Sequence, residues 1–201
     1  MSSLVPNRIR LPAGAALFVA LALALFAQLS FAGPYNTSSE GGDSRLMLRG
    51  HDPVAYFTQG RHVPGRPELH SQHEGVSYRF ASAQNKALFD REPARYAPQF
   101  GGFCSNGIAY GIPWGGDPDT WKIVDGRLYV FGGEASKRYF LMDEAKNLQL
   151  AHRYWRDEVD GSIGIVQRFW RLIWRVPHYK SGRQLEDEYQ RRLKAGEIKA
   201  G

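Results

Sequence analysis

The sequence predicts an α+β fold: a small antiparallel β-sheet with short helices, followed by a C-terminal helical extension. Two observations predict the sheet. Residues 76–80 alternate between apolar and polar side chains, and Asp125-Gly126 separates two apolar runs. Such alternation is typical of a half-buried strand, and Asp-Gly between apolar runs is a strong hairpin signal. The extension is predicted by helical periodicity over residues 134–158 and 164–176.

The N-terminus of the 201-residue chain has the pattern of an exported protein. Residues 1–10 carry two arginines and no acid, and residues 11–26 are apolar. Ser30 and Ala32 place small side chains at the positions that signal peptidase reads, so we predict a cleavable signal peptide over residues 1–32. The apolar run is shorter than the roughly 20 residues of a membrane span, although an uncleaved N-terminal anchor is the alternative. We expect a periplasmic or secreted protein.

Charge and cysteine content limit the classes of function. The 26 basic and 20 acidic residues give a net charge of +6, and the first 32 residues hold two of the basic ones. Most of the remaining excess lies in residues 156–201, so the charge gives no indication of nucleic-acid binding, and we expect no nucleic-acid partner. Cys104 is the only cysteine and cannot form an internal disulfide. Stability must therefore come from the packed core of one modest domain.

Turn and cap residues place the N-terminal elements. Residues 33–45 are rich in Pro, Asn, Ser and Gly, which predicts a flexible leader. The runs 69–73 and 76–80 flank Glu74-Gly75 and are interpreted as a β-hairpin. Ser82 is a good N-cap for a short helix ending near residue 90.

The C-terminal elements follow from the same signals. Residues 121–124 and 127–131 form the predicted second hairpin, and the helical pattern over 134–158 has a bend near Asp143. Pro177 ends the pattern of residues 164–176. The charged stretch 183–197 predicts a solvated helix or a frayed tail.

Four motifs in order give the chain a resemblance to a known family. They are HDPVAYF over residues 51–57, GVSYRFAS over 75–82, FDREPARY over 89–96 and GGFC over 101–104. This resembles the YHS domain family in its exported, stand-alone branch. The resemblance covers roughly residues 46–155 and implies a small α+β domain. We therefore expect a YHS-like domain over residues 46–158 and a basic amphipathic helix with a charged helical tail over 159–201.

The same resemblance bears on metal binding. In relatives fused to heavy-metal transporters the domain binds metal through cysteines, and the matching positions here are Ala55, Ala81 and Asn85. Since soft metals need thiolates or imidazoles, the family's metal site is not carried over. Cys104 with His51 is the remaining candidate pair for a transition metal, Cu or Zn.

Cys104 has two further interpretations. It is a small buried residue of a tight turn, or its glycine-rich loop lowers its pKa and makes it reactive, with His51 or His152 as base. Asp52, before Pro53, either caps the local turn or serves as a catalytic acid. Aromatic residues are mostly core, but some could line a pocket beside Cys104, and the candidate pocket residues are Asp52, Tyr56, Tyr78 and Phe103.

The helix predicted over residues 164–176 is strongly amphipathic. Its cations lie on one narrow face, and tryptophans lie on a wide apolar arc. This composition is typical of an interfacial membrane helix, and the alternatives are packing on the chain's own domain or on a protein partner. The residues expected to make this contact are Arg168, Trp170, Arg171, Trp174 and Arg175.

Together these patterns favour a binding or accessory protein over an enzyme. We expect it in the periplasm, associated with a membrane surface or protein partner through its C-terminal helix, with an unassigned small ligand. One alternative is metal handling through Cys104 and His51. Another is a thiol-dependent enzyme or redox protein that uses Cys104.

Overall fold

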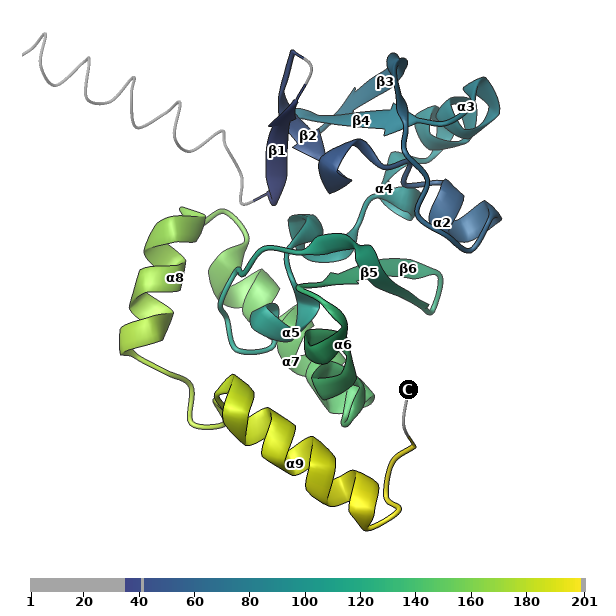
Figure 1. Ribbon diagram of the computed structural model, residues 1–201. Helices are drawn as coiled ribbons and strands as arrows, with labels where there is room; N and C mark the ends of the chain where they lie inside the picture. Colours follow the sequence, from purple (N-terminus) through teal and green to yellow (C-terminus); the bar gives the residue numbers. More distant parts are fainter. Residues whose placement is uncertain (1–34, 41, 200–201) are drawn as a thin grey trace, which may run out of the picture. The chain divides into compact units, whose positions relative to one another are not determined.

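The computed structural model describes residues 35–40 and 42–199 of the chain (Figure 1). The predicted signal peptide over residues 1–32 lies outside this range. Within the described residues, no helix has both the length and the apolar character needed to cross a membrane.

The first sheet has four strands in the order β1-β2-β4-β3, and β4 is one of its two inner strands. The strands are β1 (Thr37–Glu40), β2 (Asp43–Met47), β3 (Arg66–His73) and β4 (Val76–Phe80). β3 and β4 pair antiparallel across Glu74 and Gly75, which both have positive φ. This confirms the predicted hairpin. The prediction of a half-buried strand is wrong, because all five residues of β4 are buried, Ser77 and Arg79 included.

The N-terminal half of this sheet differs from the predicted flexible leader. β1 and β2 form an antiparallel pair, and β2 also runs parallel to β4 with Leu46 opposite Ser77. The sheet is therefore mixed, not purely antiparallel. Leu46 and Met47 are buried, so their burial outweighs the low strand propensity of the polar residues before them.

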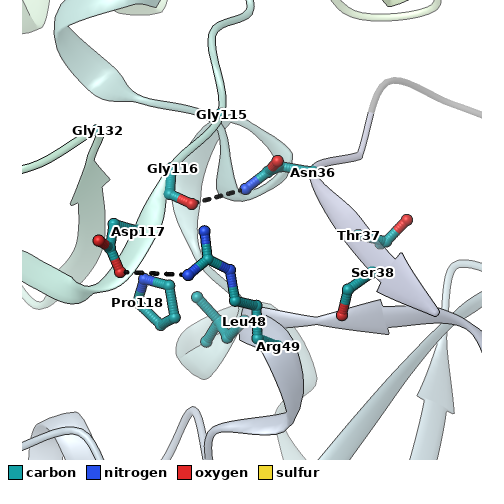
Figure 2. A pocket seen from close by; sticks show the side chains of 10 residues that line it. All are labelled: Asn36, Thr37, Ser38, Leu48, Arg49, Gly115, Gly116, Asp117, Pro118 and Gly132. Atoms are coloured by element: carbon teal, nitrogen blue, oxygen red, sulfur yellow. Dashed lines mark hydrogen bonds and ion pairs between the residues drawn. The ribbon is translucent and has the colours of Figure 1, made fainter. Parts of the chain in front are cut away.

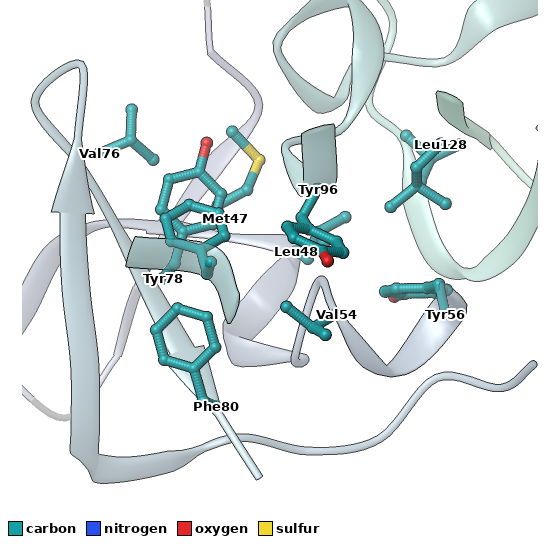
Figure 3. Packing of buried hydrophobic residues seen from close by; sticks show 11 residues of the cluster. Met47, Leu48, Val54, Tyr56, Val76, Tyr78, Phe80, Tyr96 and Leu128 are labelled. Atoms are coloured by element: carbon teal, nitrogen blue, oxygen red, sulfur yellow. The ribbon is translucent and has the colours of Figure 1, made fainter. Parts of the chain in front are cut away.

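Short helices cover this sheet and complete its core. They are η1 (Leu48–Gly50), α2 (Ala55–Thr58), α3 (Ala83–Arg91) and α4 (Pro93–Tyr96). Ser82 caps α3 as predicted, because its hydroxyl accepts from the Asn85 amide at 3.1 Å. Figure 3 shows the resulting core, in which aromatic rings from different elements meet: Met47, Leu48, Val54, Tyr56, Val76, Tyr78, Phe80, Phe89, Tyr96, Leu128 and Val130.

The second sheet is the predicted Asp125-Gly126 hairpin of β5 (Asp117–Val124) and β6 (Arg127–Phe131). Around it lie η2 (Gln99–Gly102), α5 (Ser105–Ile108), α6 (Glu134–Leu141), α7 (Glu144–Tyr154) and the π-helical turn η3 (Trp155–Val159). The helical pattern breaks at Asp143, as predicted. A second core joins these elements: Phe100, Phe103, Ile108, Ala109, Tyr129, Phe131, Phe140, Ala151 and Val159.

The C-terminal extension consists of α8 (Gly164–Ile173) and α9 (Gly182–Lys194). α8 ends before the predicted boundary because Trp174 already leaves helical geometry ahead of Pro177. α9 is not a frayed tail. Ser181 and Gln184 form a capping box, and Leu185 and Tyr189 are buried.

Ion pairs and hydrogen bonds fix α9 to the preceding helices. Tyr139 donates to Glu186 at 2.6 Å, and Arg192 donates to both carboxylate oxygens of Asp143 at 3.0 Å. The charges that suggested a solvated helix therefore serve in part as its attachment to the domain.

Candidate functional site

The polar stripe of α8 faces the protein's own domain. Arg171 Nε donates to Glu158 at 2.9 Å, and Arg168 donates to the carbonyl of Pro113 at 2.6 Å. The Arg168 guanidinium also lies over the Trp114 ring, 5.0 Å from its centroid. Glu158 belongs to η3, so the end of one helical segment holds the next through charge-assisted hydrogen bonds.

The apolar arc of α8 faces solvent in consequence. Ile165 is 75% exposed, Phe169 60%, Trp170 53% and Trp174 68%. We call the exposed apolar residues of this segment the α8 patch: Ile163, Ile165, Val166, Phe169, Trp170, Leu172, Ile173 and Trp174. A contiguous exposed patch of large apolar side chains is uncommon on a soluble monomer and is typical of interaction surfaces.

α8 therefore packs on its own domain, one of the sequence alternatives, mainly through its polar side. Of the five contact residues expected from the sequence, Trp170 and Trp174 are in the α8 patch. Arg168 and Arg171 contact the domain instead. Arg175 is exposed and lies 4.8 Å from the centre of the Tyr179 ring.

Cys104 is a buried thiol at the start of α5. Its backbone amide donates to the Trp114 carbonyl at 2.9 Å, and its Sγ lies 3.1 Å from Ser136 Oγ on α6. Only 4% of the residue is exposed, in line with the small buried residue that the sequence suggested. Neither His51 nor His152 is a hydrogen-bond partner of this sulfur within the described part of the chain.

A cavity of about 390 Å³ opens beside this thiol, and we call it the Cys104 cavity. Its walls come from α5, the Trp114 loop, α6 and the segment 179–185. Four aromatic side chains line it: Tyr110, Trp114, Tyr139 and Tyr179. None of the four was a candidate pocket residue from the sequence. Tyr139 and Tyr179 are far from Cys104 in the sequence and reach it only through the tertiary fold, whereas Tyr110 and Trp114 lie within ten positions of it.

Asp52 holds together the start of the YHS-like region. One carboxylate oxygen accepts from the amides of Val54 at 2.9 Å and Ala55 at 3.3 Å. The other accepts from the Ala81 amide at 2.8 Å and from the Asn85 side chain at 2.7 Å. Through these hydrogen bonds the carboxylate caps the turn and connects it to the residues that follow β4. The Asp52 side chain is completely buried.

The other three candidate pocket residues are core residues. Tyr56 donates to the Pro118 carbonyl at 3.0 Å, and the Tyr78 ring packs 4.6 Å from that of Phe89. Burial raises the pKa of both phenols, which keeps them protonated. Phe103 belongs to the second core.

His51 lies in a different environment from Cys104. Its Nδ1 is 2.9 Å from the Leu48 carbonyl oxygen, and its Nε2 is 4.0 Å from Asp119. The ring of His62 is 5.6 Å away. Across residues 35–40 and 42–199, no group of three or more His, Cys, Asp or Glu side chains is arranged to hold a metal ion. The geometry thus gives no support to a metal centre built on Cys104 and His51.

A second, polar hollow of about 210 Å³ lies between β1, η1 and the start of β5 (Figure 2). The Arg49 side chain extends across it toward Asp117, 3.8 Å away, while the Asn36 amide donates to the Gly116 carbonyl at 3.1 Å. Leu48, Arg49 and Gly50 all have positive φ. Sequence patterns gave no signal for this hollow.

Comparison with protein families matches one segment of the chain. Residues 54–100 match the family model of the YHS domain. The chain contains a YHS domain. Neither a search of curated proteins nor a search of solved structures gave a match. The YHS match runs from the start of α2 into η2, so Cys104, its cavity and the α8 patch all lie C-terminal to it.

Proposed function

We propose that this protein is an exported, non-enzymatic YHS-domain accessory protein that attaches to a membrane surface through the α8 patch. The observation that carries the proposal is the orientation of α8, whose polar stripe is fixed to the domain while its apolar arc is exposed. Full burial of a Phe or Trp side chain contributes roughly 2–3 kcal/mol, so three exposed aromatic residues supply a substantial driving force.

A lipid surface fits the patch better than a soluble partner for two reasons. Trp170 and Trp174 combine a large apolar ring with one N–H donor, which suits the boundary between headgroups and acyl chains. A single ten-residue helix, about 15 Å long, also gives a narrow convex ridge that can enter the headgroup layer. The signal peptide predicted from the sequence supports export, and an exported chain would meet a membrane surface on the far side of the membrane it crosses.

The orientation of α8 also determines how the attachment should respond to salt. Arg168 and Arg171 already interact with the domain, which leaves Arg175 as the exposed cation of this segment in the described structure. Binding should therefore be driven by apolar burial and depend only weakly on ionic strength. An interfacial helix that presents its whole cationic face would instead lose affinity steeply as salt is added.

The test is sedimentation of the mature chain with vesicles made from zwitterionic and anionic phospholipids, at low and high salt. The double substitution Phe169→Ser and Trp170→Ser should weaken partitioning at least about tenfold, since each ring contributes on the order of 2 kcal/mol. The matched control replaces two exposed glutamines elsewhere, Gln59→Ser and Gln84→Ser, and should bind like the parent.

Two results would overturn the membrane proposal. One is equal vesicle binding by the parent and the Phe169/Trp170 variant. The other is absence of vesicle binding together with a concentration-dependent dimer, seen by analytical ultracentrifugation, that the same variant abolishes. In the second case the α8 patch is a contact between copies of this chain.

A further inference from the structure

The Cys104 cavity has the shape and lining of a small-molecule site. It measures about 390 Å³, and its lining is mainly aromatic side chains and glycine backbone. Pockets of a few hundred Å³ with apolar walls and few polar groups are the usual form of ligand sites. We propose that the Cys104 cavity binds a neutral, flat aromatic molecule of about two fused rings that carries one hydroxyl or carbonyl group.

The aromatic walls indicate a flat ligand. Tyr110 and Trp114 follow α5, Tyr139 comes from α6, and Tyr179 comes from the segment before α9. Aromatic rings prefer offset-stacked or edge-to-face neighbours, so a planar ring gains more between such walls than a saturated one of equal size.

These walls are held in place from outside the cavity. The guanidinium of Arg168 covers Trp114 at 5.0 Å, and that of Arg175 covers Tyr179 at 4.8 Å. On the inner side, Tyr110 packs against Tyr179 with ring centroids 5.4 Å apart. Walls that are already ordered lose little conformational entropy when a ligand binds.

The charges around the cavity favour a neutral ligand. Lys180 lines it, but its ammonium group pairs with Glu188, which also accepts from Arg192 at 2.7 Å. Burial raises the pKa of Tyr110 to about 12, so its phenol is uncharged. Since no lining cation in the described structure lacks a carboxylate partner, an anionic ligand would have to displace an existing ion pair.

Two polar side chains offer a place for a single ligand oxygen. The half-buried amide of Asn106 lines the cavity and has no hydrogen-bond partner within residues 35–40 and 42–199. Ser136 Oγ and Cys104 Sγ already share one hydrogen bond across the cavity wall. A hydroxyl or carbonyl group on the ligand can therefore accept from Asn106 Nδ2 or from Ser136 Oγ.

Calorimetric titration of the mature chain with 2-naphthol tests this proposal, with decahydro-2-naphthol as the saturated control of similar size. Aromatic pairing is worth about 0.5–1.5 kcal/mol beyond area, so naphthol should bind about threefold to tenfold more tightly. Ala135→Trp places an indole at the cavity wall and should weaken naphthol binding at least about tenfold. Glu134→Trp is the matched control, because it adds the same ring one residue away on α6, outside the cavity.

Three results would overturn it: no measurable binding of naphthol, equal binding by the two tryptophan variants, or equal affinity for the saturated alcohol. A further arm separates this site from the membrane surface. If naphthol binds to the α8 patch instead, the Phe169→Ser/Trp170→Ser variant should lose naphthol binding and Ala135→Trp should retain it. That result would contradict the proposed cavity site and leave the vesicle experiment unaffected. Loss only in Ala135→Trp supports the cavity whether or not the patch binds lipid.

Discussion

Asp52→Asn is the substitution that best tests how the start of the YHS domain is held together. The carboxylate accepts four hydrogen bonds in a site that excludes water: two from the amides of Val54 and Ala55, one from the Ala81 amide and one from the Asn85 side chain. An amide of the same shape keeps one acceptor oxygen and turns an N–H₂ group toward one of the two donor pairs. At least one buried N–H then faces another donor.

The expected cost follows from those contacts. If the new N–H₂ faces Ala81 and Asn85, the Asn85 amide can rotate and restore one hydrogen bond, but the Ala81 amide stays unpaired. Each hydrogen bond to a charged group contributes about 1.5–3 kcal/mol, and an unsatisfied buried donor costs about 1–3 kcal/mol. We therefore expect Asp52→Asn to lower the free energy of unfolding by about 3 kcal/mol.

Urea denaturation followed by circular dichroism measures this change, with Asn85→Ala as the partner in a double-mutant cycle. The two substitutions should be clearly less than additive, because they remove one shared hydrogen bond. A loss below about 1 kcal/mol for Asp52→Asn, less than the cost of one unsatisfied buried donor, would refute the reasoning and reopen a catalytic role for this carboxylate.

Three further predictions concern other parts of the chain. Burial, together with the nearby Arg127, lowers the pKa of His152, so the unfolded chain binds a proton at this imidazole before the folded chain does. The free energy of unfolding should therefore decrease as the pH falls below 6.5, the ordinary pKa of histidine. His152→Gln should make Tm fall less with decreasing pH, and an equal fall of Tm in parent and variant would contradict this. Arg49→Gly should raise the free energy of unfolding by about 1 kcal/mol, because φ is 49° there and a left-handed residue with a side chain costs about 1–2 kcal/mol, whereas Arg49→Ala should not. Glu158→Gln should weaken the attachment of α8 through Arg171 and speed amide hydrogen exchange in α8 but not in α3; unchanged exchange would argue against this anchor.

The elements that sequence patterns predicted are those determined by local chemistry. Both hairpins turn at an acidic residue followed by glycine, and all four turn residues have positive φ, which is the geometry that such dipeptides favour. Ser82 as a helix cap and the break at Asp143 are equally local. The parallel pairing of Leu46 with Ser77 is not, since it joins residues 31 positions apart through a strand whose neighbours look like a linker.

The candidate sites were harder to predict for the same reason. Burial of Cys104 follows from its residue type and its glycine-rich surroundings, and the structure has it buried. The cavity beside it depends on Tyr179 and Leu185, more than 70 positions along the chain, and on a segment whose charges suggested solvent exposure. No sequence periodicity around Cys104 or in residues 179–185 indicates that these two segments line the same cavity.

The orientation of α8 shows most clearly what a helical wheel leaves undetermined. The wheel correctly separates the arginines from the tryptophans, but it does not say which face turns toward the domain. That choice depends on Glu158, Gly111 and Pro113, whose carboxylate and backbone carbonyls accept from the polar stripe. Because only the polar side of α8 carries donors for these acceptors, rotating α8 to bury its aromatic residues would remove the hydrogen bonds that Glu158 accepts from Arg171 and Gln167. The exposed apolar arc is therefore maintained by specific polar contacts, which is the property expected of a binding surface and not of a misplaced core helix.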